Sequence, residues 1–129
     1  MPEGQTMQKC ILVIEDETQI RTLLRQNLES EGYRVLEAEN GAVGITLYQQ
    51  NAVDLVITDL IMPEKEGLET IRELRRLSPQ VKIIAMSGGG KIEPEQYLSI
   101  AQKLGVLRTF TKPFRRNEIL TAVKELLSF

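Results

Sequence analysis

The hydrophobic pattern changes its period repeatedly along the chain. Runs of consecutive apolar residues, such as Cys10 to Ile14, are followed by stretches in which apolar residues recur at the spacing of an amphipathic helix. Gly32 ends the first such stretch. The pattern predicts strands over residues 10–14, 34–38, 54–59, 81–87 and 107–111, and helices over residues 20–28, 40–50, 67–77, 94–104 and 116–127. Five strand–helix units in succession predict a parallel sheet with helices packed on both faces.

The predicted strands differ in how continuously apolar they are. The first, third and fourth contain unbroken apolar runs at residues 11–14, 55–57 and 83–86, as expected where helices bury both faces of a sheet. Polar residues interrupt the second and fifth strands, which is typical of sheet edges. We therefore expect a doubly wound α/β fold, a flavodoxin-like three-layer sandwich with a five-stranded parallel sheet of order 2-1-3-4-5. In this order the ligand crevice lies at the carboxyl ends of strands one and three.

Length and composition narrow the classes of function. The 129 residues fit a single domain, which we place at residues 9–129 after an N-terminal extension at residues 1–8. The net charge of -2 provides no positive field for direct binding of nucleic acid or a membrane surface. No apolar run predicts a membrane span or a secretory signal, so we expect a cytoplasmic location. The absence of histidine excludes histidine-based metal sites and Ser-His-Asp catalysis, and the lone Cys10 is interpreted as a buried apolar residue.

Acidic side chains are expected to meet at the predicted crevice. Glu15 and Asp16 follow the first strand, and Asp59 ends the third. Carboxylates in close proximity repel one another, and a hard divalent cation with oxygen ligands relieves the repulsion; Mg²⁺ suits this set better than Ca²⁺ does. Ser87 and Lys112, at the ends of the fourth and fifth strands, add a hydroxyl donor and a cation. We also expect Asp16 to cap the first helix.

Four short motifs lie at these strand ends: Glu15-Asp16-Glu17, Asp59-Leu60-Ile61-Met62-Pro63 with Gly67, Ser87-Gly88, and Lys112-Pro113-Phe114. Together they resemble the receiver domain of bacterial two-component response regulators, of the chemotaxis-regulator type, from about Lys9 to the end of the chain. The resemblance implies that Asp59 accepts a phosphoryl group. It also implies a Mg²⁺ site made by Glu15, Asp16, Asp59 and the backbone carbonyl of Ile61. Ser87 and Lys112 would then hold the phosphoryl group.

The resemblance further implies a signalling function in a phosphorelay. A sensor histidine kinase or a histidine phosphotransfer protein would supply the phosphoryl group, and the chain would catalyse only its own phosphorylation and dephosphorylation. The surface of the fourth helix, fifth strand and fifth helix would then bind a downstream protein, with the chain a monomer or weak dimer. Gly88, Gly89 and Gly90 form the expected hinge. Because Thr109 replaces the usual aromatic residue and Phe110 comes next, we expect the change mainly at residues 88–94.

Other functions remain open at this point. A phosphohydrolase of the haloacid-dehalogenase type would also use Asp59 as a covalent nucleophile, but it normally has a second acid where this chain has Ile61. A flavin or nucleotide carrier would need a phosphate-binding loop where Glu15-Asp16-Glu17 would repel phosphate. The chain is alternatively the receiver part of a longer regulator with a DNA-binding or enzymatic output domain.

Overall fold

The computed structural model describes residues 8–60, 67–87, 99 and 102–128. In chain order the elements are β1 (Cys10–Ile14), α1 (Thr18–Ser30), β2 (Arg34–Ala38), α2 (Gly41–Gln50), β3 (Leu55–Asp59), α3 (Gly67–Leu77), β4 (Ile83–Ser87), β5 (Arg108–Thr111) and α5 (Arg116–Leu127). The predicted extension at residues 1–8 lies outside the described residues except for Gln8, whose side-chain amide donates to the Gly32 carbonyl at 3.1 Å.

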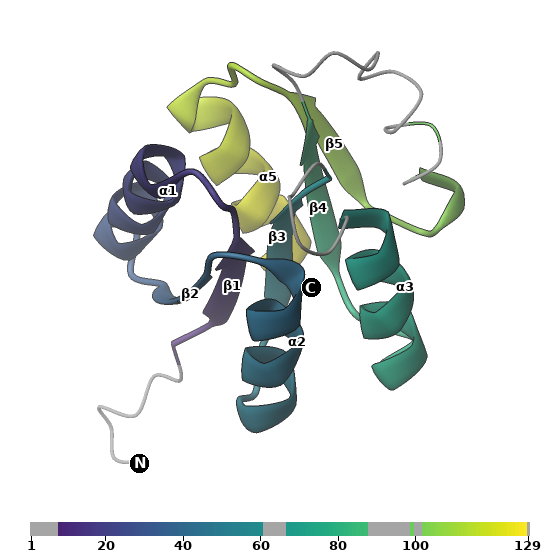
Figure 1. The fold of residues 1–129 in the computed structure, drawn as a ribbon. Coiled ribbons are helices and arrows are strands. Elements are labelled where there is room, and N and C mark those ends of the chain that lie inside the picture. The colour runs from purple at the N-terminus through teal and green to yellow at the C-terminus, as the bar shows by residue number, and fades with distance from the viewer. Residues whose placement is uncertain (1–7, 61–66, 88–98, 100–101, 129) are drawn as a thin grey trace.

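The strands form one parallel sheet in the order β2-β1-β3-β4-β5 (Figure 1). Every residue of β1, β3 and β4 is buried, whereas β2 and β5 both contain exposed residues. The predicted strand order and the predicted edge strands are therefore confirmed. The physical reason is that helices bury both faces of the central strands, and only strands covered on both faces can be apolar at every position.

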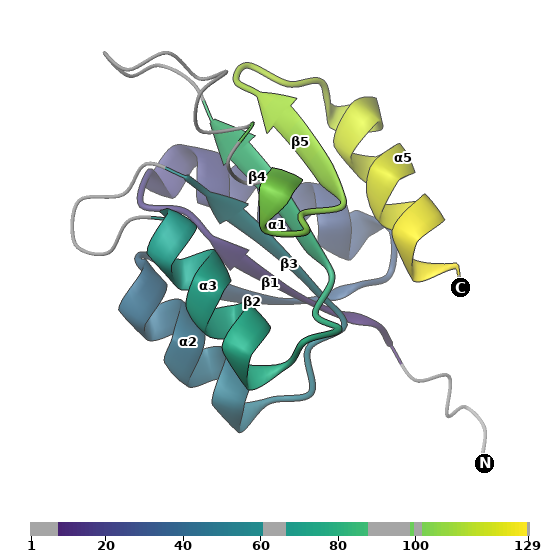
Figure 2. The same ribbon diagram turned by 90° about the vertical axis from the view of Figure 1, so that its right-hand side faces the viewer.

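Two apolar cores flank the sheet because successive side chains of a strand point to opposite faces. Leu12 and Ile14 of β1 pack in the core that includes α2 and α3, while Ile11 and Val13 pack in the core that includes α1 and α5. Figures 1 and 2 show these two helix pairs on opposite sides of the sheet. The molecule is thus the predicted three-layer sandwich.

Most element boundaries agree with the sequence pattern, and the differences are small. The strands predicted over 54–59, 81–87 and 107–111 begin slightly later, at Leu55, Ile83 and Arg108. Most of the helix predicted over 94–104, for which the label α4 is kept, lies outside the described residues, although Ser99, Gln102 and Lys103 are helical. Among the helices that the structure describes, none combines the length and apolar character needed to cross a membrane.

The prediction that Asp16 caps α1 is wrong. Glu17 is the N-cap residue and makes no side-chain capping bond. Its carbonyl accepts the Arg21 amide at 3.0 Å, and the helix begins at Thr18, two residues after Asp16. Glu15 reaches the Glu17 amide instead, with 3.0 Å between its Oε2 and the nitrogen. Asp16 therefore stays in the connection between β1 and α1, where its carboxylate is available to the crevice.

Candidate phosphoacceptor and metal site

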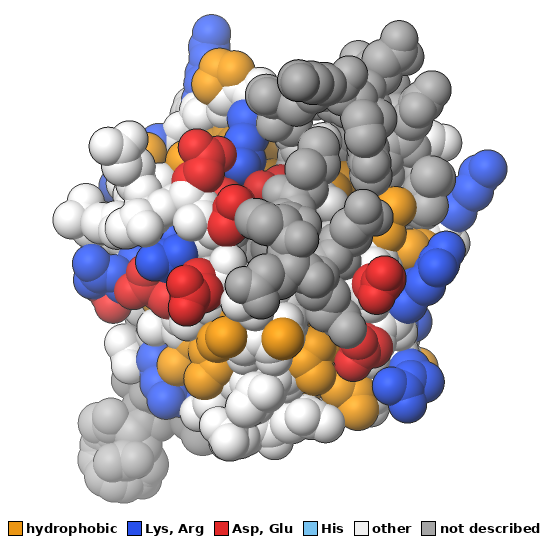
Figure 3. Space-filling view, viewed as in Figure 1, with side chains coloured by type: hydrophobic (Ala, Val, Ile, Leu, Met, Phe, Trp, Pro, Cys, Tyr) orange, Lys and Arg blue, Asp and Glu red, His pale blue; other side chains and the backbone are white. Residues whose placement is uncertain are grey.

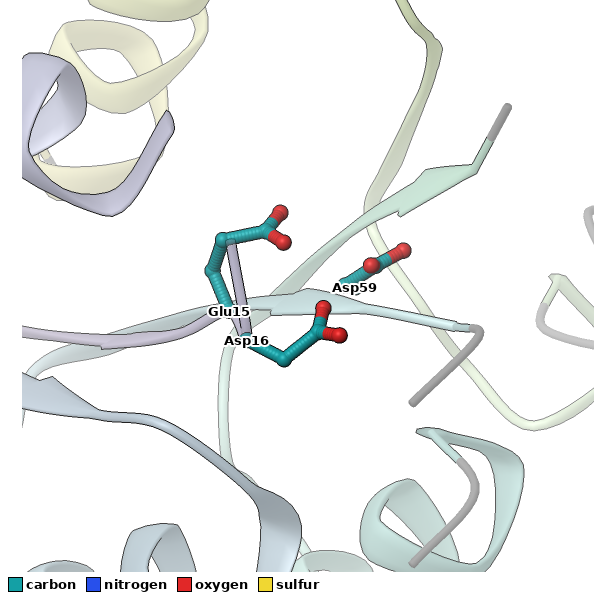
Figure 4. A group of neighbouring side chains, drawn as sticks. All are labelled: Glu15, Asp16 and Asp59. Atoms are coloured by element: carbon teal, nitrogen blue, oxygen red, sulfur yellow. The ribbon is translucent and has the colours of Figure 1, made fainter. Parts of the chain in front are cut away.

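Three carboxyl groups meet at the carboxyl ends of β1 and β3. One oxygen from each of Glu15, Asp16 and Asp59 lies within 4.8 Å of the others. Figure 4 shows Glu15 and Asp16 extending from the connection after β1 and Asp59 extending from the end of β3 toward the same space. Glu15 and Asp59 are buried and Asp16 is half-buried. The fold thus brings together the three acids that the strand order placed at the crevice.

Glu15 is held by its backbone and by both oxygens of its carboxylate. Its amide donates to the Ala38 carbonyl at 2.9 Å, next to the last β1–β2 register pair. Its Oε2 accepts the Glu17 amide, and its Oε1 accepts the Lys112 ammonium group at 2.7 Å. A carboxylate with both oxygens bonded has little freedom to rotate. Glu15 is therefore a fixed part of the site.

Lys112 is the cation of the crevice. Its amide donates to the Ser87 carbonyl at 2.7 Å, just beyond the end of β5. Its side chain is 12% exposed and turns inward, as predicted, toward the acids. Besides its contact with Glu15, the ammonium nitrogen lies 3.3 Å from Asp59 Oδ2 and 3.6 Å from Glu17 Oε1. One lysine therefore faces three carboxylates, two of which are buried.

The crowding of these charges changes how they bind protons. Burial, and to a lesser extent the charge of Asp59, raise the pKa of Glu15 from 4.5 to about 7. The hydrogen bonds from Lys112 and Glu17 and the charge of Lys112 lower the pKa of Glu15, but they offset only part of this rise. Burial alone would lower the pKa of Lys112, but its hydrogen bond with Glu15 and the charges of Asp59 and Glu15 raise it above its usual value. Lys112 therefore stays charged, while the protonation of Glu15 changes near neutral pH.

Ser87 contributes a buried hydroxyl at the end of β4. It follows Met86, which is the register partner of Asp59 in the neighbouring strand. Its side-chain oxygen is fully buried and has no hydrogen-bond partner among the described residues. Buried hydroxyls without a partner are uncommon, because leaving a polar group unpaired costs free energy. The hydroxyl is thus available to a group that enters the crevice.

The start of α3 is packed directly against the backbone of Asp59. The Gly67 amide donates to the Leu60 carbonyl at 3.0 Å. A Cβ atom at position 67 would collide with the carbonyl oxygen of Asp59 and the Cα of Leu60. Only glycine lets the helix begin this close to the strand end. Gly67 therefore shapes the support of Asp59.

The donor set fits a hard divalent cation. The clustered ligands are carboxylate oxygens, which Mg²⁺ and Ca²⁺ prefer, and the sequence has no histidine to favour a softer metal. The predicted carbonyl ligand at Ile61 lies outside the described residues, as do the predicted hinge residues Gly88, Gly89 and Gly90. In β5, Thr109 and Phe110 are half-buried, and Phe110 packs against the core beneath α1 and α5.

Comparison with known families identifies the kind of domain that carries this site. Residues 11–124 match the model of the response regulator receiver domain. The chain belongs to this receiver domain family. The match spans all of the described strands except Cys10 of β1, and it includes all of the acids and the lysine of the crevice, which confirms the resemblance drawn from the four motifs. This receiver domain is therefore a signalling domain of the two-component type.

Individual proteins that are similar to this receiver domain agree with its family assignment. The sporulation initiation phosphotransferase F of Bacillus subtilis is 31% identical over 121 residues, which cover 94% of this chain and 95% of the relative. The transcriptional regulatory protein ResD of the same organism is 36% identical, with 95% of this chain matching 50% of that longer protein. The solved response regulator protein TrrA of Thermotoga maritima is 35% identical, with a TM-score of 0.81 and coverage of 92% and 99% of the two chains.

Sequence reasoning missed a pair of charged residues beside the site of this receiver domain. Arg21 donates to the backbone carbonyl of Glu15 at 2.8 Å, and its Nε lies 3.2 Å from Glu37 Oε1. The available signal was weak: Arg21 comes one helical turn after Glu17, and Glu37 precedes the last residue of β2. Charged residues at such positions are usually solvent-exposed, and only their contacts in the fold distinguish them.

Proposed function

We propose that this chain is a phosphorylation-dependent switch in which Asp59 is the phosphoacceptor. The observation that carries the proposal is the placement of the buried Asp59 carboxylate, which lies 3.3 Å from the Lys112 ammonium group and beside Glu15 and Asp16. A carboxylate oxygen of Asp59 would attack the phosphorus of a phosphohistidine. The oxygen–phosphorus bond forms, the nitrogen–phosphorus bond breaks, and the imidazole of the donor leaves with the electron pair.

Glu15, Asp16 and Asp59 would hold Mg²⁺ at this site, together with the carbonyl of Ile61. When bound, Mg²⁺ would neutralise charge on the phosphoryl oxygens and orient the donor for in-line transfer. The requirement follows from charge, because in the described part of the chain a single lysine, Lys112, faces three carboxylates, and a dianionic phosphoryl group adds more negative charge. The related TrrA structure, described as a complex with Mg²⁺ and beryllium fluoride, supports the proposal.

Lys112 and Ser87 would bind the phosphoryl oxygens once the group is on Asp59. Lys112 already contacts Asp59 with little exposure to water, so its charge acts at short range in a site of low dielectric constant. The Ser87 hydroxyl has no competing partner among the described residues and can rotate to donate. These new bonds exist only in the phosphorylated state, and such differential contacts are what shift a two-state equilibrium.

We further propose that a sensor histidine kinase or a histidine phosphotransfer protein supplies the phosphoryl group. The response would be read on the surface of the fourth helix, β5 and α5, with Gly88, Gly89 and Gly90 as the hinge, and a downstream protein would bind there. The match to half of ResD indicates that receiver domains also work within longer regulators. The proposed readout surface is the same in either setting.

Intact mass tests the phosphoacceptor directly. The chain is incubated with acetyl phosphate and Mg²⁺, and we expect a single added phosphoryl group that is absent from Asp59→Asn and absent when the metal is chelated. Asp54→Asn is the matched control, because Asp54 precedes β3, at the opposite end of the same strand from Asp59. Full modification of Asp59→Asn, or no effect of chelation, contradicts the proposal. Sustained release of phosphate from external esters would instead indicate a phosphohydrolase.

A further inference from the structure

A network of charged side chains connects α1 and β2 to the backbone of the acid cluster. Arg21 binds the Glu15 carbonyl through Nη1 and Glu37 through Nε, at 2.8 and 3.2 Å. Glu37 also pairs with Arg25, whose Nε lies 2.9 Å from its Oε2. The Arg21 side chain is 17% exposed, against 34% for Arg25. Figure 3 shows basic and acidic side chains side by side over the region of α1 and β2.

From this network we infer that Arg21 is a positioning residue for the metal-binding carboxylates, an inference that rests on the proposed function. Arg21 fixes the peptide group between Glu15 and Asp16 by holding the carbonyl of that group. Rotation of this peptide group would move both carboxylates relative to Asp59. The remaining bonds of Glu15 run through its amide and its carboxylate, so neither of them holds the carbonyl in place.

Glu37 gives Arg21 its orientation and compensates its charge. An arginine next to a cation site would disfavour a second cation if its charge were not balanced. Glu37 accepts a hydrogen bond from Arg21 and forms an ion pair with Arg25, so it can hold Arg21 in the geometry that reaches Glu15. Among the described residues, Arg25 shares Glu37 with Arg21 but makes no hydrogen bond or ion pair with Glu15, and it bonds to Glu29 on its own helix at 3.3 Å. It is therefore the matched control for Arg21.

The surroundings of Arg21 allow chemical rescue. Arg21, Glu37, Glu39 and Val43 line a hollow of about 300 Å³. Removal of the Arg21 side chain would enlarge this hollow next to the Glu15 carbonyl and the Glu37 carboxylate. A guanidinium ion carries the same planar set of donors as the lost side chain and is small enough to enter. Free guanidinium should therefore restore part of the function of Arg21→Ala.

The experiment measures Mg²⁺ affinity, amide exchange and phosphorylation in parallel. Mg²⁺ is titrated into the unphosphorylated full chain, with hydrogen exchange of the Glu17 amide followed by NMR, and the rate of phosphorylation by acetyl phosphate is measured at saturating Mg²⁺. We expect Arg21→Gln to weaken Mg²⁺ binding by about tenfold, in the range for residues that orient metal ligands. The Glu17 amide should exchange faster, and millimolar guanidinium should partly restore Mg²⁺ binding to Arg21→Ala.

The controls separate positioning from general stability. Arg25→Gln should lower thermal stability to a similar extent as Arg21→Gln but change Mg²⁺ affinity by less than about twofold, since a residue orients a metal ligand only when it contacts that ligand. Arg21→Lys keeps the charge with fewer donors, and should fold normally with intermediate affinity. Equal Mg²⁺ affinity in Arg21→Gln and Arg25→Gln overturns the inference. If the parent chain neither binds Mg²⁺ nor gains a phosphoryl group, the proposed function itself fails, and the inference fails with it.

Discussion

The two ends of the sheet use charged side chains in opposite ways. At the amino ends of the strands they bind the backbone: Arg75 donates to the carbonyls of Pro79, Val81 and Gly105 at 2.8, 3.0 and 2.9 Å. Lys82 likewise donates to the Leu126 carbonyl at 2.7 Å, and the carboxylate of Asp54 accepts the Cys10 amide at 2.7 Å.

At the carboxyl ends, charged side chains mostly face each other. Glu15 and Asp59 are buried beside Asp16, with Lys112 as the compensating cation among the described residues. The Ser87 hydroxyl has no described partner. Most charged groups at the amino end are therefore bound by their own chain, although the Arg75 Nε is buried without a partner among the described residues. The carboxyl end instead gathers crowded carboxylates and an unpaired hydroxyl at one place, where a ligand can contact them. Sites with such unsatisfied groups are commonly where binding and catalysis occur.

The largest expected effect comes from removing the cation of the carboxyl end. Lys112→Ala should slow phosphorylation of Asp59 by about a hundredfold, the usual loss when a donor to a charged transition state is removed. Stopped-flow phosphorylation by a small-molecule donor measures the rate. Lys124→Ala, on the exposed surface of α5, should leave the rate unchanged. A rate within a few-fold of the parent would show that Lys112 does not act on the phosphoryl group.

Removing a cation from the amino end, Arg75, should change the stability of the fold but not the rate of phosphorylation. Arg75→Ala leaves three backbone carbonyls without their donor and should lower the free energy of unfolding by about 2–3 kcal/mol. Urea unfolding measures the loss, and phosphorylation of the folded protein should proceed at the parent rate. Arg76→Ala, at an exposed neighbouring position, is the control and should be nearly neutral. Impaired phosphorylation in Arg75→Ala would mean that the two ends are not independent.

The pKa of Glu15 predicts how Mg²⁺ binding depends on pH. Because this pKa is about 7 and the metal binds the ionised carboxylate, affinity should rise about tenfold from pH 6 to pH 8. Without metal, a rise in pH acts on the stability of the fold in the opposite direction. Because folding raises the pKa of Glu15, this group stabilises the folded state fully below its unfolded pKa of 4.5, and the contribution is lost as the pH rises through 7. Calorimetric titrations measure the affinity, and Glu15→Gln should flatten its pH dependence.

The smallest expected effect is the change in stability of the unphosphorylated protein when the Ser87 hydroxyl is removed. Ser87→Ala should raise the free energy of unfolding by about 0.5–1 kcal/mol, since a buried group without a described partner is replaced by an apolar one. The same variant should shorten the lifetime of the phosphorylated state. Ser30→Ala is the contrast, because the Ser30 hydroxyl donates to the Asn27 carbonyl at 2.7 Å. A destabilised Ser87→Ala would indicate that the hydroxyl is already bonded in the resting state.

Sequence reasoning predicted the fold well because the signals were repeated and redundant. Each central strand carries its own apolar run, and the two interrupted runs had to lie at the edges. Boundaries were less accurate: β3 begins at Leu55, and Asp54 ahead of it bonds to Cys10 through both its carboxylate and its backbone amide. Turn and cap positions depend on such single hydrogen bonds, which an apolar pattern does not encode.

The sequence by itself determined the strand order and, through it, the meeting of Glu15, Asp16 and Asp59. The carboxyl ends of parallel strands share one edge of the sheet, so residues that end central strands must be neighbours there. Only the tertiary structure decided which atoms bond. Lys112 meets Glu15 across 97 positions of the chain, Glu17 rather than Asp16 is the N-cap residue of α1, and Arg21 holds the Glu15 carbonyl. These contacts depend on how far each side chain extends and on the free-energy cost of burying unpaired charge. Both are determined only when the helices have packed on the sheet.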